Sequence, residues 1–145
     1  MSMRVGLIGI AVICAVIAAC STASAAESES PEPLPPPNAE TAGTEGFWDF
    51  REGVVILGFI ENHGIPTRFL FKWGRTKAYG KRAYVGEGAY VYNGPEPEGP
   101  EEVEGLTGRL RPDTTYHYRL IAWNRAGKSI GQDRTFHTPR AKARH

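Results

Sequence analysis

The stretch 116–124 alternates between two kinds of side chain at every second position. One set is aromatic or apolar, and the other is mixed and includes charged residues. The first set is Tyr116, Tyr118, Leu120 and Ala122, and the second is His117, Arg119, Ile121 and Trp123. A period of two predicts a β-strand, and one apolar face beside one mixed face is typical of an antiparallel sheet with a solvated side.

Two further segments, 54–60 and 67–73, show the same pattern and are separated by turn residues. Asn62, Gly64 and Pro66 lie between them, and residues of these types end strands. The alternation predicts a common set of core-facing positions, namely Val54, Ile56, Gly58, Ile60, Phe69 and Phe71.

Weaker signals predict the remaining elements of an all-β chain. Short strands are expected at 47–50, 84–92, 103–110 and 130–138, the last of these closing the fold. Residues 93–104 contain five Glu, three Pro and two Gly and predict an exposed acidic loop.

A turn, a tyrosine and an alternating strand follow one another in the order Leu110-x-Pro112-x-Thr114-x-Tyr116, then Ala122-x-Asn124-x-x-Gly127. This spacing resembles part of the fibronectin type III family, and Asn62-His63-Gly64, Phe69-x-Phe71-x-Trp73-Gly74 and Tyr79-Gly80 resemble its bacterial members. The resemblance implies an immunoglobulin-like antiparallel β-sandwich of about seven strands over residues 47–139, with Pro112, Thr114 and Tyr116 forming a tyrosine corner. It implies a shape and no ligand.

The amino terminus is expected to be a secretory signal over residues 1–20. Arg4 precedes fifteen apolar or small residues, fewer than the roughly twenty that a membrane span needs. Two processing sites compete. Ile17-Ala18-Ala19-Cys20 is similar to a bacterial lipobox, in which Cys20 would carry lipid, whereas Ala23-Ser24-Ala25 fits plain cleavage.

Two polar segments flank the predicted sandwich. Residues 21–46 are rich in Ser, Glu and Pro and are expected to form a disordered linker, and residues 140–145 are expected to form a basic tail. The only two cysteines, Cys14 and Cys20, lie within the predicted signal, so the sandwich is expected to fold without disulfides.

One candidate partner patch follows from the second strand. Val55, Leu57 and Phe59 alternate with the core positions and therefore face outward, where polar residues are usual. Either Phe47 and Trp48 fold back over them, or a bulge shifts the register, or they form a hydrophobic contact surface.

A candidate ligand site follows from the other sheet, where cations and an indole share the outward positions. Its residues are Arg68, Lys72, Arg119 and Trp123. Cations beside an indole suit an anionic or sugar-like ligand, and a solvated face with a structural Arg–Trp contact is the alternative.

Charge is unevenly distributed although the formal net charge is +1. Residues 27–66 carry eight acids and one base, whereas residues 67–92 carry six bases and one acid. Basic residues are interleaved with sheet positions and match no nucleic-acid motif, so no nucleic-acid partner is expected.

No catalytic, metal-binding or cofactor motif is present in the sequence, and no enzyme activity or cofactor is expected. Ser129, His117 and Asp133 are the residue types of a Ser–His–Asp catalytic triad, but nothing in the sequence places them together in a cleft. The sequence therefore predicts an exported, lipid-anchored cell-envelope module that binds protein or polysaccharide. An accessory module of secreted carbohydrate-active or hydrolytic machinery and a plain spacer remain alternatives.

Overall fold

The computed structural model describes residues 30–142 except 50, 87–88, 93 and 96–98. For residues 46–49 it describes the backbone and not the side chains. The chain divides into two units, 1–31 and 32–145. The predicted signal and Cys20 lie outside the described residues.

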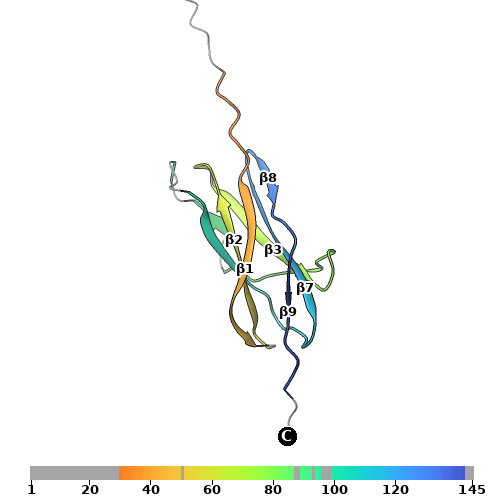
Figure 1. Ribbon diagram of the computed structural model, residues 1–145. Coiled ribbons are helices and arrows are strands. Elements are labelled where there is room, and N and C mark those ends of the chain that lie inside the picture. The colour runs from red at the N-terminus through yellow and green to blue at the C-terminus, as the bar shows by residue number, and fades with distance from the viewer. Residues whose placement is uncertain (1–29, 50, 87–88, 93, 96–98, 143–145) are drawn as a thin grey trace, which may run out of the picture. The chain divides into compact units, whose positions relative to one another are not determined.

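The second unit is a sandwich of two antiparallel sheets (Figure 1). A small sheet has the order β1-β2-β6, with β1 at Asn38–Asp49, β2 at Gly53–Glu61 and β6 at Glu101–Leu106. In the large sheet β3, at Thr67–Gly74, pairs with β7, at Thr115–Asn124. Short strands extend both sides of this pair: β4 (Lys81–Arg82) and β5 (Tyr90–Val91) on β3, and β8 (Gly127–Ile130) and β9 (Arg134–His137) on β7. The described residues contain no helix, so the predicted all-β antiparallel sandwich is confirmed.

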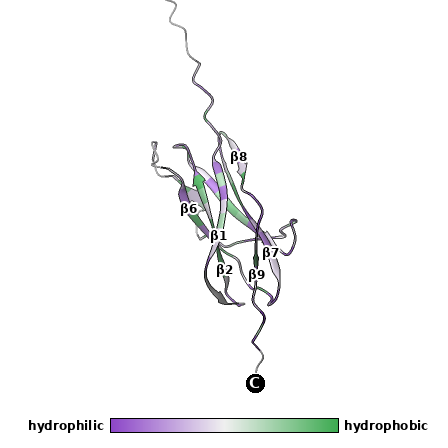
Figure 2. Cartoon of the chain, viewed as in Figure 1, coloured by the Kyte–Doolittle hydropathy of each residue, from purple (hydrophilic) through white to green (hydrophobic). Residues whose placement is uncertain are grey.

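The core forms between the sheets from the residues that the alternation predicted. Ile56 and Ile60 of β2 face Phe71 of β3 and Leu120 of β7, and all four side chains are fully buried. Green hydrophobic positions recur along β2 and β3 in Figure 2. Removing this apolar surface from water is the main contribution that stabilises a chain with no cysteine in its folded part.

Tyr116 joins the start of β7 to the loop before it. Its ring is buried, stacks on Phe136 with centroids 5.4 Å apart, and places its hydroxyl where it accepts a hydrogen bond from the Arg111 N–H at 2.9 Å. This contact has the geometry of a tyrosine corner.

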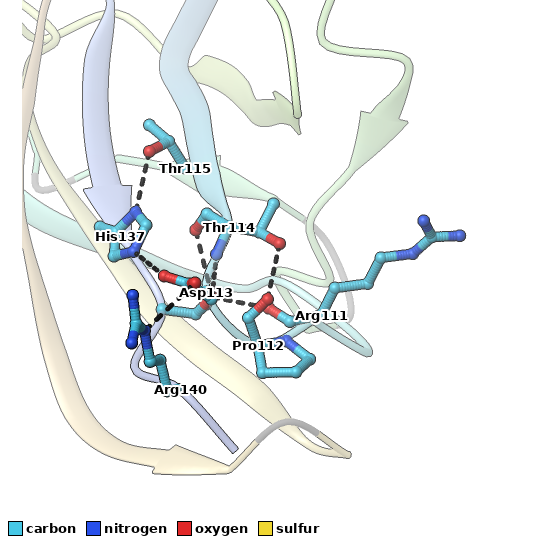
Figure 3. A network of polar contacts seen from close by, with 8 residues as sticks. Arg111, Pro112, Asp113, Thr114, Thr115, His137 and Arg140 are labelled. Carbon is cyan, nitrogen blue, oxygen red and sulfur yellow. Dashed lines mark hydrogen bonds and ion pairs between the residues drawn. The ribbon is translucent and has the colours of Figure 1, made fainter.

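The turn in front of Tyr116 is held by a polar network (Figure 3). The Thr114 hydroxyl donates to the Pro112 carbonyl at 2.8 Å, and the Thr138 hydroxyl donates to the Arg111 carbonyl at 2.6 Å. Asp113 adopts a positive φ of 49°, and its carboxylate accepts from His137 at 3.0 Å. The loop therefore ties β7 to the strand that ends the sandwich.

The first strand begins at Asn38, nine residues before the expected start at 47, so the predicted linker 21–46 is wrong over its last nine residues. The early half of β1 packs through small and polar side chains instead of large apolar ones. Thr41 is fully buried, and its hydroxyl accepts a hydrogen bond from the Leu120 N–H at 3.1 Å. A strand held this way carries no hydrophobic periodicity.

The predicted closing strand 130–138 is divided into β8 and β9. Thr41 explains the interruption, because its hydroxyl occupies the Leu120 N–H that a continuous neighbouring strand would have used. Gly131 passes beside it, and a Cβ there would lie 2.3 Å from the Thr41 hydroxyl oxygen. The Gly131 N–H still donates to the Leu120 carbonyl at 2.8 Å, and the chain then leaves the ladder of β7 and rejoins it at Arg134.

Two other expectations are corrected at the edges. The predicted edge strand 84–92 is reduced to β5 and an isolated bridge between Tyr84 and Leu106. The predicted acidic loop 93–104 ends in strand β6, where Val103 and Gly105 face inward and Glu102 and Glu104 face out.

Candidate functional site

The outer face of the large sheet carries side chains in rows, because directly paired residues of antiparallel strands point to the same side. The first row crosses four strands: Tyr90 pairs with Arg68, Arg68 with Trp123, and Trp123 with Lys128. Arg68 thus lies between two aromatic residues, one on each neighbouring strand.

Two more rows continue this face along the strands. The next is apolar and consists of Leu70, Ile121 and Ile130. The third is cationic and consists of Arg82, Lys72 and Arg119. We call the ten residues of the three rows the basic face; five are cations and none is acidic.

A groove of about 680 Å³ lies on the β5 side of this face. It is lined mainly by apolar and aromatic groups, with two guanidinium groups at its sides. Its wall includes Arg68, Leu70, Arg82, Val85, Tyr90 and Trp123. A concave surface with aromatic walls and a few fixed charges is typical of small-molecule and sugar sites.

The structure brings together the four residues that the sequence proposed as a ligand site. Arg68 is paired with Trp123, and Lys72 is paired with Arg119. Arg68 is exposed, whereas the other three are partly buried. Three further residues of the face, Arg82, Tyr90 and Lys128, were not predicted from the sequence, because they lie on strands of two to four residues that give no periodic signal.

A polar cluster lies beside the third row. The Arg119 guanidinium packs over the Tyr79 ring, 4.5 Å from its centroid. The Tyr79 hydroxyl donates to Asp133 at 2.7 Å, and His117 Nδ1 lies 2.9 Å from the other carboxylate oxygen of Asp133. Because a carboxylate only accepts, Nδ1 carries the proton in this contact. The cluster holds Arg119 in place at the border of the basic face.

The pKa of Asp133 is lowered in this cluster. Burial raises it, but the hydrogen bonds from His117 and Tyr79 and the positive charges of His117 and Lys77 outweigh burial. The pKa of Tyr79 is raised, first by burial and then by its hydrogen bond to Asp133, so its hydroxyl stays protonated and remains a donor.

Asp133→Asn is expected to reduce the acid sensitivity of folding. Since the pKa of Asp133 is lower folded than unfolded, its charge stabilises the fold above the unfolded value of about 3.9, and this is lost as the pH falls through the folded value. The difference in unfolding free energy between wild type and variant, measured by urea denaturation, should shrink below about pH 4. A difference that stays constant down to about pH 2 would show that the charge contributes nothing.

Ser129 does not form a catalytic triad with His117 and Asp133. It pairs with the core-facing Ala122, so it lies on the opposite side of the sheet from His117. Its hydroxyl oxygen accepts a hydrogen bond from the Ala39 N–H at 3.1 Å. The His117–Asp133 pair thus lacks this nucleophile.

The outer face of the small sheet has the opposite charge. Val55, Leu57 and Phe59 of β2 are partly buried and form a central apolar column. Acids flank it on both neighbouring strands: Glu40 and Glu45 on β1, and Glu102 and Glu104 on β6. We call these seven residues the acidic face.

The register explains why the predicted partner patch faces outward. The core-facing set of β2 is in place, and the register shifts lie in β1, between Thr41 and Thr44 and between Glu45 and Asp49. The expected covering by Phe47 and Trp48 concerns side chains outside those described. The patch is thus a column between two lines of carboxylates.

Neither a metal centre nor a membrane-spanning helix is found in the described parts of the chain. No three His, Cys, Asp or Glu residues among them gather as a metal site would require. No helix there is long and apolar enough to cross a bilayer.

Comparisons with known proteins leave the ligand open. No protein-family model matches the chain, and no curated protein matches its sequence. One similar solved structure is the sensor domain of the anti-sigma factor RsgI4 of Pseudobacteroides cellulosolvens, with 15% identity, 75% of this chain and 95% of that chain covered, and a TM-score of 0.45. At this level the likeness supports no activity or partner for this chain.

Proposed function

We propose that this protein is an exported, non-enzymatic binding module whose basic face holds an anionic polysaccharide of the cell envelope. The observation that carries the proposal is the arrangement of the three rows, in which an apolar row lies between two rows that contain five cations. No acid interrupts them, so the field of the face attracts anions.

The chemistry of the rows suits a charged sugar polymer. Tyr90 and Trp123 flank Arg68 and offer flat apolar surfaces on which sugar rings stack. Arginine guanidinium groups bind carboxylate or sulfate in a two-pronged fashion, and Lys72 adds a compact charge nearby. The groove beside Arg68 provides a defined binding position for one segment of the polymer.

Other proposals concern the setting of the module. Its two-sheet order and the Tyr116–Arg111 contact support a fibronectin type III-like module. The position of Ser129 on the other side of the sheet from His117 supports a role without catalysis. We further propose no cofactor and no nucleic-acid partner.

Cys20 is proposed as the lipid-bearing first residue of the mature protein, because Ile17-Ala18-Ala19-Cys20 closes the apolar run. Mass spectrometry of protein recovered from membranes is expected to show an acylated amino terminus at Cys20. An unmodified terminus at Ala26 would instead show plain secretion. Either result leaves the proposal for the basic face untouched.

Binding is tested with dextran sulfate, using uncharged dextran as the matched control polymer. The purified protein is expected to bind dextran sulfate and not dextran, and to lose binding as salt shortens the screening length from about 10 Å at 0.1 M to about 3 Å at 1 M. Arg68→Glu with Lys72→Glu should weaken binding at least about tenfold, which corresponds to about 1.4 kcal/mol.

Arg109→Glu/Arg111→Glu is the control for net charge, because it also replaces two cations by two acids, and both arginines are exposed in the loop before β7 and belong to none of the rows. It should bind nearly as well as wild type. Equal weakening by Arg109→Glu/Arg111→Glu would show attraction by net charge alone. Unchanged binding in Arg68→Glu/Lys72→Glu would exclude the basic face, and absence of binding in all variants would favour an accessory module or a spacer.

A further inference from the structure

We propose that a second copy of this chain docks on the acidic face through its basic face, so that copies associate head to tail. This proposal goes beyond the proposed function, because it assigns a partner to the other sheet of the sandwich. It rests on complementarity of charge and of apolar surface between two faces of one molecule.

The acidic face has the charges that the basic face lacks. Glu40 and Glu45 line one side of the apolar column of β2, and Glu102 and Glu104 line the other. All four glutamates are exposed, and none of their directly paired neighbours on the face is a cation. The acids thus leave their charge available to a partner.

The two faces also match in layout. Each has an apolar stripe between two lines of like charge: the column Val55, Leu57 and Phe59 on one, and the row Leu70, Ile121 and Ile130 on the other, in which Leu70 and Ile130 supply the accessible surface because Ile121 is buried. The acidic lines are two strands apart, about 10 Å, and the cationic rows are four residues apart along β3, about 13 Å. Long side chains span the difference.

The directions of the stripes fix the docking angle. The apolar stripe of the acidic face runs along its strands, whereas that of the basic face runs across them. Apolar surface therefore meets apolar surface, and carboxylate meets cation, when the strands of the two copies cross near a right angle. Sheets are known to pack in this orthogonal way.

The symmetry of the contact follows from the sign of the charges. A two-fold dimer would place like charges against each other, on either face. The faces belong to opposite sheets of the sandwich, so a contact between unlike faces leaves one free face on each copy. Such a heterologous contact propagates into an open chain or closes into a ring.

The small size of the faces makes this contact weak. The basic face covers about 13 Å along the strands and about 14 Å across them. That is well below the roughly 800 Å² per partner of a standard interface, so we expect a dissociation constant on the order of 0.1–1 mM. Copies concentrated on one surface would reach such effective concentrations.

Sedimentation velocity of the full mature protein tests the proposal with two charge-reversal variants. Glu102→Lys/Glu104→Lys reverses two of the four acids of the acidic face, and Arg68→Glu/Lys72→Glu reverses two of the five cations of the basic face. Wild type is expected to sediment faster as its concentration rises toward about 1 mM at low salt. Each variant alone should stay monomeric, because one of its two faces then carries charges of both signs and no longer complements the other.

An equimolar mixture of the two variants should associate again, at least to a dimer. The unaltered basic face of one then meets the unaltered acidic face of the other. Monomeric wild type, self-association of either variant, or no dimer in the mixture of folded variants would overturn the proposal. Dextran sulfate binding separates it from the proposed function, since Glu102→Lys/Glu104→Lys loses self-association and keeps the polymer site.

Discussion

Replacing Phe71 by alanine is expected to lower the free energy of unfolding by about 3–5 kcal/mol. The ring is fully buried between the two sheets and meets Phe69 edge to face, with centroids 6.3 Å apart. Its removal exposes no new surface and leaves a cavity that rigid strands on both sides cannot close. The loss of buried apolar surface and the loss of van der Waals contacts around the cavity therefore both lower the free energy of unfolding.

Urea denaturation followed by tryptophan fluorescence measures this change. Tyr84→Ala is the control, because the Tyr84 side chain is 69% exposed and its removal should change stability by less than about 0.5 kcal/mol. Equal, small effects of the two substitutions would mean that the sheets are not packed around Phe71.

Adding a single methyl group at Gly105 is expected to destabilise the fold by about 1–3 kcal/mol. A Cβ at this position would lie 2.8 Å from Phe71 Cδ2 and 3.1 Å from Ala83 Cβ. Gly58 on the neighbouring strand has a similar constraint, with a Cβ 2.6 Å from Leu120 Cδ2 and 2.9 Å from the Glu40 carbonyl oxygen. The two glycines give the Phe71 ring room against the small sheet.

A double-mutant cycle with Phe71→Leu distinguishes the two positions. A smaller side chain at 71 should relieve much of the cost of Gly105→Ala, whose nearest neighbour is the Phe71 ring. It should relieve little of the cost of Gly58→Ala, because the Glu40 carbonyl belongs to the backbone and cannot move aside.

Gly43→Ala is the matched control, since a Cβ at Gly43 has no atom within 4 Å. It should leave stability nearly unchanged. Additive costs for Gly105→Ala and Phe71→Leu would contradict the inferred packing of the ring against this glycine.

The sequence alone predicts which side of the sheet the residues of the basic face share, but not which of them are neighbours. Alternation along 67–73 and 116–124 predicted that Arg68, Lys72, Arg119 and Trp123 share one face, because the side-chain period of a strand is local. Which of them are neighbours depends on register, and register came from the pairing of β3 with β7. Only that pairing places Arg68 beside Trp123 and Lys72 beside Arg119.

Tertiary packing also decided the elements that have no apolar pattern. The first half of β1 is held by the Thr41 hydroxyl, and β6 packs through Val103 and Gly105 while Glu102 and Glu104 face outward. Small and polar residues at such positions give no hydrophobic period from which a strand can be recognised. Their roles depend on contacts with distant segments of the same chain: Thr41, for example, bonds Leu120, about eighty residues away.

The sequence by itself determined the strand class, the inward and outward sets of β2, β3 and β7, and the turn before Tyr116. These follow from local periodicity and from backbone preferences of Pro, Asp and Gly. Only the tertiary structure decided the register, the division of β8 from β9 and the opposite charge of the two faces. Those features arise from contacts between strands distant in the chain, whose free energies depend on which surfaces fit together, and no single segment contains that information.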